Sequence, residues 1–314
     1  MKKVLCIILC AVLLSSLMVF AKIQLTPMLM KHANFGNTPL KSAKYTDDVF
    51  IGSSMFRQGI DAEGLRDENE TSYLLAYNGN QPVFEKLLIQ DLLGSGVIMD
   101  TLYVDMYAYS LSNSVGLSDV RMFQDMPLSF TLDLYRLMKT HGTADLGDLF
   151  EMTVKANNEL FFTWPVSFPL INQRFQKGSS LGRQPGSSAD QLAQLPVEFG
   201  SPVPDPAQVQ AVRELIALCE ERGIKVVFVE TPKYIRLYES KNYQAIMTEY
   251  IALLEDCGCE MIISKKTADI CGVTPSKLIR QYYFQYENPA YFTDLIHLSY
   301  EGRQAFTKAV ARYI

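Results

Sequence analysis

The pattern of apolar residues predicts five short β-strands, each buried on both sides. The apolar blocks lack the alternation of apolar and polar residues that marks a strand with one face in water. Turn-forming residues such as Gly, Asn and Pro follow several of these blocks. The predicted strands cover residues 48–51, 73–77, 101–106, 225–230 and 260–264.

Amphipathic stretches around these blocks indicate α-helices. One of them follows Asp205, a good helix cap, and begins at Pro206, which suits the first helical turn. Gly223 then ends that helix. The predicted helices cover residues 82–93, 128–139, 206–222, 243–255 and 299–314.

Strands that alternate with helices are typical of a parallel sheet covered on both faces. We therefore predict an α/β fold, a three-layer α/β/α sandwich with a mostly parallel, flavodoxin-like sheet. In such sheets the reactive side chains gather at the carboxyl ends of the strands. Candidate residues are therefore expected where the predicted strands end.

The chain has 314 residues, enough for one large domain behind a targeting segment. We assign residues 1–22 to a signal-anchor or signal peptide, residues 23–45 to a connector and residues 46–314 to a single α/β domain. Within that domain, residues 177–205 are rich in Gly, Ser and Pro, which predicts a surface insertion.

The N-terminal residues predict export across the cytoplasmic membrane. Lys2 and Lys3 precede an apolar run over residues 4–21, which at ~1.5 Å per residue would cover about 27 Å of a bilayer. Positive charge before the run places the remainder outside the cytoplasm. Two outcomes stay open: the run remains as a membrane anchor, which its length favours, or it is cleaved after Ala21 to give a secreted product.

Charge and cysteine spacing restrict the classes of function. The net charge of −5 argues against nucleic-acid binding, which normally uses a basic face. Cys257 and Cys259 are too close for the usual zinc spacing and the chain has only three histidines, so we expect no metal and no other cofactor. Disulfides are compatible with export, but the pairing of the exported cysteines stays open. These are Cys219, Cys257, Cys259 and Cys271.

Two glycine-containing turns at predicted strand ends offer groups for acyl chemistry. Ser54 follows the first strand in Gly52-Ser53-Ser54, where its hydroxyl would be presented and its N–H could donate to an oxyanion. Gly79 follows the second strand, and its N–H could be a second donor. Both sequences are also typical of ordinary turns, so neither is sufficient alone.

The pair Asp294 and His297 is a more specific signal. Both lie just before the last predicted helix, and Asp294 is close enough in sequence to reach Nδ1 of His297. An aspartate there would fix the ring tautomer and leave Nε2 as a general base toward a serine. A purely structural hydrogen bond at a helix start would have the same spacing.

The combination of these motifs resembles the SGNH, or GDSL-like, hydrolases. In that family the nucleophilic serine follows the first strand, an oxyanion glycine follows the second, and an Asp-x-x-His motif precedes the last helix. Gly52-Ser53-Ser54, Asn78-Gly79-Asn80 and Asp294-Leu295-Ile296-His297 stand at those places. The chain looks most similar to the membrane-anchored SGNH-like proteins that work beside MBOAT acyltransferases, as in teichoic-acid D-alanylation and alginate acetylation.

The sequence departs from the family pattern in two motifs. Ser53 stands where aspartate is usual, and Tyr109 stands where the third block should supply an oxyanion asparagine. The Tyr109 hydroxyl or the Asn80 side chain could replace that donor. Loss of one oxyanion donor typically lowers the rate by roughly 10²–10³-fold.

The resemblance implies an extracytoplasmic serine esterase or O-acyltransferase that acts on acyl groups of a cell-envelope polysaccharide. Ser54 would be the nucleophile, His297 the base and Asp294 its orienting partner. The expected partners are an envelope glycan or acylated small molecule, an MBOAT-type membrane acyltransferase, and the membrane through residues 4–21. The alternative is a non-catalytic SGNH scaffold that binds a glycan or the acyltransferase.

Overall fold

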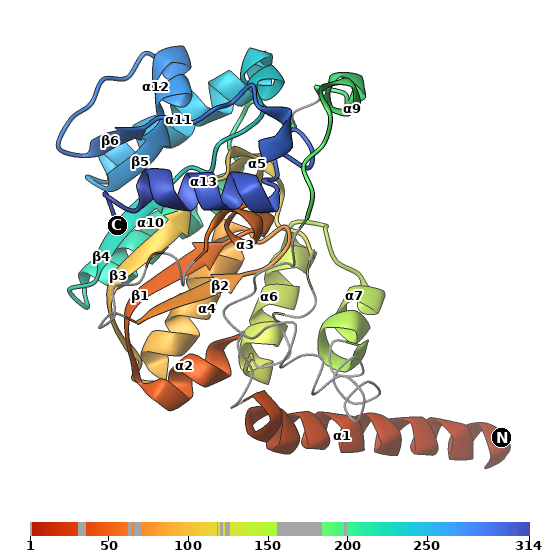
Figure 1. The fold of residues 1–314 in the computed structure, drawn as a ribbon. Helices are drawn as coiled ribbons and strands as arrows, with labels where there is room; N and C mark the ends of the chain where they lie inside the picture. The colour runs from red at the N-terminus through yellow and green to blue at the C-terminus, as the bar shows by residue number, and fades with distance from the viewer. Residues whose placement is uncertain are drawn as a thin grey trace.

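A computed structural model describes residues 2–30, 36–61, 65, 71–117, 119, 122, 126–155, 184–197 and 200–314. In this part of the chain, a six-stranded sheet has the order β2-β1-β3-β4-β5-β6, and all neighbouring strands are parallel (Figure 1). The strands are β1 (Tyr45–Gly52), β2 (Ser72–Ala76), β3 (Ile98–Asp105), β4 (Lys225–Val229), β5 (Glu260–Ser264) and β6 (Ile279–Tyr282).

Helices precede, separate and follow these strands. The α-helices of the described residues are α1 (Lys2–Met30), α2 (Asn37–Ala43), α3 (Ser54–Gly59), α4 (Pro82–Gly94), α5 (Ala108–Ser112), α6 (Leu128–Thr140), α7 (Leu146–Phe150), α9 (Ala189–Gln194), α10 (Pro206–Glu220), α11 (Lys241–Asp256), α12 (Lys265–Cys271) and α13 (Tyr300–Val310). Short 3₁₀ segments cover Ile235–Glu239 and Pro289–Tyr291, and a π-helical turn covers Glu151–Lys155.

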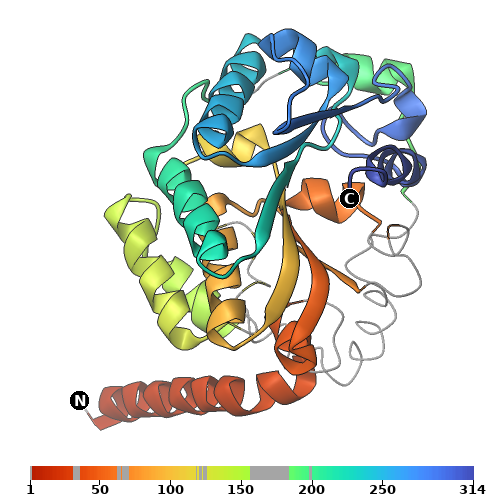
Figure 2. The same ribbon diagram turned by 90° about the vertical axis from the view of Figure 1, so that its left-hand side faces the viewer.

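Helices cover both faces of the sheet, which Figure 2 shows nearly edge-on. Successive strand residues point to opposite faces. Val49 and Ile51 belong to the apolar cluster that contains α4, α10 and α11, whereas Phe50 between them belongs to the cluster that contains α3 and α13. All three side chains are fully buried. The predicted three-layer α/β/α sandwich with a parallel sheet is confirmed.

The strand order creates a switch point at the carboxyl ends of β1 and β3. From β1 the chain passes to β2 on one side, and it then returns past β1 to β3 on the other. Crevices form at such points because successive connections diverge. Gly52 ends β1 and Asp105 ends β3. The side chains at and just beyond these residues are therefore well placed to form a site.

The apolar pattern does not predict β6. The strand has four residues, of which Ile279 and Tyr282 are buried while Arg280 and Gln281 are half-buried. It lies at the edge of the sheet and pairs with β5 alone, where Arg280 forms an ion pair with Glu260. A short edge strand with two polar residues lacks the continuous apolar block that marks the central strands.

The N-terminal apolar run belongs to α1, which continues to Met30 and extends away from the sheet (Figures 1 and 2). Residues 23–45, expected as a connector, include the end of α1 and all of α2. Within the described residues, no helix combines the length and the hydropathy needed to cross a membrane. Export and anchoring stay predictions from the sequence.

Candidate active site

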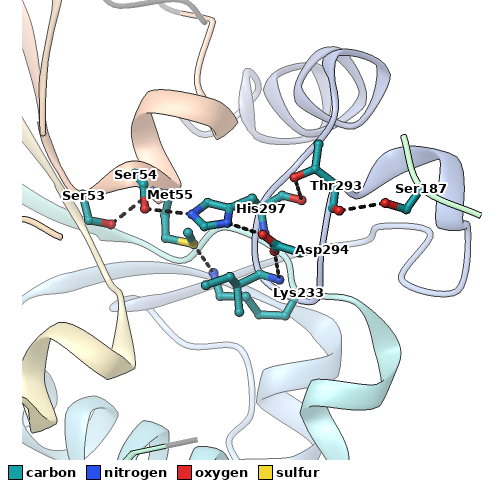
Figure 3. Close-up of polar contacts among 9 residues, drawn as sticks. Ser53, Ser54, Met55, Ser187, Lys233, Thr293, Asp294 and His297 are labelled. Carbon is teal, nitrogen blue, oxygen red and sulfur yellow. Dashed lines mark hydrogen bonds and ion pairs between the residues drawn. The ribbon is translucent and has the colours of Figure 1, made fainter. Parts of the chain in front are cut away.

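Ser54 occupies the first position of α3, directly after the turn that ends β1. Ser53 caps this helix, because its Oγ accepts a hydrogen bond from the Met55 N–H at 3.1 Å. Such a cap satisfies one of the unpaired N–H groups at the helix start and fixes the direction of the chain. The half-buried Ser54 side chain then points toward His297 (Figure 3).

Asp105 holds this turn from the end of β3. Its Oδ2 accepts hydrogen bonds from the Ser53 N–H at 3.1 Å and from the Ser53 Oγ at 2.5 Å. Glycine is required at position 52, since a Cβ there would lie 2.3 Å from the Asp105 Cβ. Burial raises the pKa of Asp105 to about 6, although Lys233 and the bonds from Ser53 oppose the shift.

Asp294 shapes the loop that carries His297. Its Oδ1 accepts hydrogen bonds from the N–H groups of Ile296 and His297, each at 2.8 Å. Its Oδ2 lies 2.7 Å from His297 Nδ1. Burial opposes ionisation of Asp294, but the bonds from the His297 ring and the two N–H groups hold its pKa below its ordinary value. One carboxylate therefore orients both the loop backbone and the imidazole.

The three residues predicted as catalytic form one continuous chain of hydrogen bonds. His297 Nε2 lies 2.9 Å from Ser54 Oγ, within the range for proton transfer (Figure 3). The two residues are 243 positions apart in sequence, and the fold alone brings them together. Asp294 and His297 are therefore not an isolated pair at a helix start, because the second ring nitrogen contacts the serine.

The residues predicted as oxyanion donors lie around the same strand ends. The Ser54 N–H lies at the first position of α3, where backbone N–H groups have no carbonyl partner within the helix. Gly79 has a φ of 62°, a left-handed conformation that favours glycine. Asn80 is fully buried, and its Nδ2 donates to the Gly52 carbonyl at 3.2 Å. That bond gives the Asn80 amide a structural role at the end of β1.

Tyr107 and Tyr109 stand between two open pockets at the carboxyl end of the sheet and line both of them. The first pocket, of about 340 Å³, is bordered by residues 294–296 of the histidine loop. The second, of about 400 Å³, is bordered by residues 79–81 after β2. The ring centroids of the two tyrosines are 5.9 Å apart, and Tyr109 remains 41% exposed. Tyr109 is therefore accessible to a ligand in either pocket.

Residues 184–197, the described part of the predicted insertion, pack against the domain. Leu192 of α9 is fully buried in the cluster that contains α13. Leu195 and Pro196 line the first pocket. Most residues of this segment are nevertheless exposed, so the predicted surface insertion stays a prediction, and Leu192 and Leu195 are the side chains that attach the segment to the domain. Residues 177–183 and 198–199 lie outside the described residues.

Backbone contacts attach this segment to the histidine loop. The Ser187 N–H donates to the Phe292 carbonyl at 2.7 Å, and the Ser187 Oγ donates to the Thr293 carbonyl at 2.7 Å. The Tyr300 N–H donates to the Gln184 carbonyl at 2.9 Å. The loop that carries Asp294 and His297 is therefore held on its outer side by residues more than a hundred positions earlier.

A buried lysine also contacts the serine turn. Lys233 is 1% exposed, and its Nζ donates to the Thr231 carbonyl at 2.9 Å and the Thr231 Oγ1 at 2.7 Å, with Met55 Sδ at 3.5 Å. Burial lowers the pKa of Lys233, and three carboxylates oppose this shift: Asp105, Glu230 and Asp294. Lys233 was not predicted as a site residue, because its one signal in the sequence is a position just beyond the predicted strand 225–230.

Among the described residues, the cysteines are unpaired and the other potential metal ligands are dispersed. Within the part of the chain that the structure describes, no cluster of His, Cys, Asp or Glu is arranged to hold a metal ion. All six cysteines lie among the described residues as free thiols. Burial raises the pKa of Cys219 and of Cys259 to about 12, which keeps both thiols protonated and unreactive.

Comparisons with known proteins found a weak structural similarity. No family model matches the chain, and no curated protein matches it. Among solved structures, the chain is similar to a protein from Streptococcus pneumonia provisionally described as a platelet activating factor, with 10% identity and a TM-score of 0.40. That alignment covers 88% of this chain and 90% of the other. The likeness is too weak to assign a function.

Proposed function

We propose that this protein is a serine esterase or O-acyltransferase of the SGNH hydrolase type, acting on acyl groups of a cell-envelope polysaccharide. The hydrogen-bonded chain from Ser54 through His297 to Asp294 is the observation that carries the proposal. A nucleophile, a base and a group that orients the base are the parts that acyl transfer through a serine requires.

In the proposed reaction, Ser54 Oγ attacks the ester carbonyl while His297 Nε2 takes its proton. Asp294, bonded to Nδ1, stabilises the imidazolium that forms. The N–H groups of Ser54 and Gly79 are the proposed donors to the oxyanion. Collapse expels the alcohol, which receives the proton from His297 and leaves an acyl-Ser54. Water (hydrolysis) or a glycan hydroxyl (transfer) then attacks with His297 again as base, and Ser54 regains its proton.

The proposed location and partners rest on the sequence rather than on the fold. Lys2 and Lys3 before the apolar residues 4–21 favour an extracytoplasmic domain anchored to the cytoplasmic membrane. The resemblance to the anchored SGNH-like proteins adds an MBOAT-type membrane acyltransferase as the proposed partner. Neither the location nor the partner is needed for the chemistry at Ser54.

Hydrolysis of 4-nitrophenyl acetate by the full-length chain tests the nucleophile. Ser54→Ala is expected to lower the rate by roughly 10³-fold or more, because the attacking group is lost. The matched control is Ser42→Ala, which alters an exposed serine of α2. Activity that survives Ser54→Ala would contradict the assignment. A wild-type chain with neither turnover nor fluorophosphonate labelling would favour the non-catalytic binding scaffold.

A further inference from the structure

The two pockets beside the catalytic residues differ in position and in chemistry. The first borders residues 294–296, directly before His297, and its other walls are mostly apolar: Leu195, Pro196, Leu237, Tyr107 and Tyr109. The second borders residues 79–81 and is lined largely by carboxamides, hydroxyls and backbone. Each is large enough to hold part of a small-molecule ligand. We call the first the histidine-side pocket.

Proton transfer decides which part of an ester belongs in the histidine-side pocket. The leaving or incoming alcohol oxygen must come within hydrogen-bond reach of His297 Nε2, because that nitrogen gives and takes its proton. The proposed oxyanion donor Gly79 lines the second pocket, whereas residues 294–296 of the histidine loop line the first. The alcohol part of the ester therefore lies over the histidine loop, in the first pocket.

The walls of this pocket suit an uncharged ring. Sugar rings have apolar C–H faces that pack on apolar and aromatic surfaces, and a tyrosine offers such a surface with a polar end. Tyr109 is 41% exposed and lines the pocket, whereas Leu237 and Leu295 form its buried floor. A ring could therefore lie against Tyr109 with its hydroxyl edge toward His297.

The same walls disfavour an anionic sugar. Carboxylates and phosphates are normally recognised by arginine or lysine, and among the described residues neither pocket is lined by one. Lys233 is buried against Thr231, and Arg236 is held by the carbonyls at the end of α9. Asp294, whose lowered pKa keeps it ionised, is the charged residue on the wall. The net charge of −5 adds a weak general repulsion.

We infer that the histidine-side pocket is the alcohol subsite and that it selects a neutral sugar ring over a uronate or a phosphate-bearing polyol. This inference rests on the proposed function and narrows it to esters of neutral glycans. Tyr109 is then a residue that determines specificity by stacking, rather than the third oxyanion donor.

A matched pair of esters tests the charge preference. The probes are methyl 3-O-acetyl-β-D-glucopyranoside and the corresponding glucuronate, which differ in the carboxylate at C6, and acetate release by the full-length chain is measured. We expect kcat/KM to be about tenfold or more higher for the neutral ester, because the carboxylate would face Asp294 without a cation. Equal values, or a preference for the glucuronate, would overturn the inference while leaving the esterase proposal intact.

A positive charge introduced into the wall of the histidine-side pocket provides a second test of the charge preference. Leu195→Arg should shift the ratio of kcat/KM toward the glucuronate, whereas its control Leu195→Gln should not, since it adds polarity without charge. Leu195 is half-buried and outside the histidine loop, and thermal unfolding of both variants reports on folding. If the ratio of kcat/KM shifted equally in both variants, or in neither, the inference that this pocket discriminates between neutral and charged esters would be contradicted. Absence of turnover of both sugar esters and of 4-nitrophenyl acetate would overturn the proposed function, and the inference with it.

Two substitutions of Tyr109 separate stacking from oxyanion donation. Tyr109→Ala should raise KM for the neutral ester about tenfold, because one contact between the sugar ring and an aromatic ring is lost. Tyr109→Phe should leave KM nearly unchanged, because the ring face remains. A fall in kcat of roughly 10²-fold in both variants would instead identify the hydroxyl as an oxyanion donor and overturn the stacking role.

Discussion

The Ser53 hydroxyl donates to Asp105 Oδ2 at 2.5 Å, and through this contact the end of β3 holds the turn that carries Ser54. The two neighbouring serines therefore have separate tasks. Ser53 is hydrogen-bonded to Asp105 at the end of β3 and caps α3, whereas the Ser54 side chain points toward His297. This division makes the pair a sensitive test of the site.

Labelling by a fluorophosphonate should distinguish the two serines. Ser54→Ala should abolish labelling because, among the described residues, Ser54 carries the hydroxyl that is bonded to the His297 ring. Ser53→Ala should keep measurable labelling but lower the free energy of unfolding by about 1 kcal/mol, the usual cost of a lost helix cap. Denaturant unfolding gives that second value. Labelling that disappears in Ser53→Ala but persists in Ser54→Ala would reverse the assignment.

Asp294→Asn should reduce kcat for 4-nitrophenyl acetate by roughly 10³–10⁴-fold with little change in KM. An asparagine still has an oxygen for the Ile296 and His297 N–H groups, so the loop should keep its shape. Its NH₂ group would face Nδ1, however, and favour the wrong tautomer of His297. Steady-state kinetics measure the effect. A loss smaller than tenfold would limit Asp294 to a structural role.

Asp105 should make stability depend on pH. Its pKa is about 6 in the folded protein against an ordinary value of 3.8, so between these values the folded state binds more protons than the unfolded state. The stabilising contribution is full below about pH 4 and is lost as the pH rises through about 6. The resulting decrease in the free energy of unfolding is at most about 3 kcal/mol.

The isosteric variant Asp105→Asn isolates this effect. It keeps an acceptor for Ser53 but does not titrate, so its free energy of unfolding relative to wild type should rise between about pH 4 and pH 7. Urea unfolding at both pH values measures the difference. A constant difference across this window would mean that Asp105 titrates normally in the folded protein.

Gly52→Ala should destabilise the protein by roughly 2–4 kcal/mol and disturb the serine turn. The new Cβ would lie 2.3 Å from the Asp105 Cβ, and neither strand can move without breaking its pairing. Gly94→Ala at the end of α4 is the control, because nothing lies within 4 Å of its added Cβ. That change should stabilise the helix by about 0.5–1 kcal/mol. Equal effects in thermal unfolding would refute the steric argument.

The central part of the fold was predictable because its signals are local. A buried strand leaves a continuous apolar block, and Ser54 and His297 each stand beside a regular element whose boundary residues are distinctive. β6 was not predictable, because a four-residue edge strand needs few apolar side chains.

The roles of Asp105 and Lys233 could not be predicted from the sequence either. Each depends on the close approach of two strands that are distant along the chain, and a single charged residue at a strand end has no local pattern. The packing of residues 184–197 was hidden for a different reason. Their Gly, Ser and Pro content indicates turns, but it does not indicate which surface the turns contact.

The attachment of Ser187 to the histidine loop has a consequence for how activity is lost. The bonds to Phe292 and Thr293 join backbone groups outside the sheet, and such contacts open at a lower free energy than the core. An opening event there would withdraw His297 from Ser54 while six strands remain paired. Inactivation by heat or denaturant should therefore precede the loss of secondary structure, and amide exchange at residues 292–297 should follow activity more closely than exchange in β1 or β3.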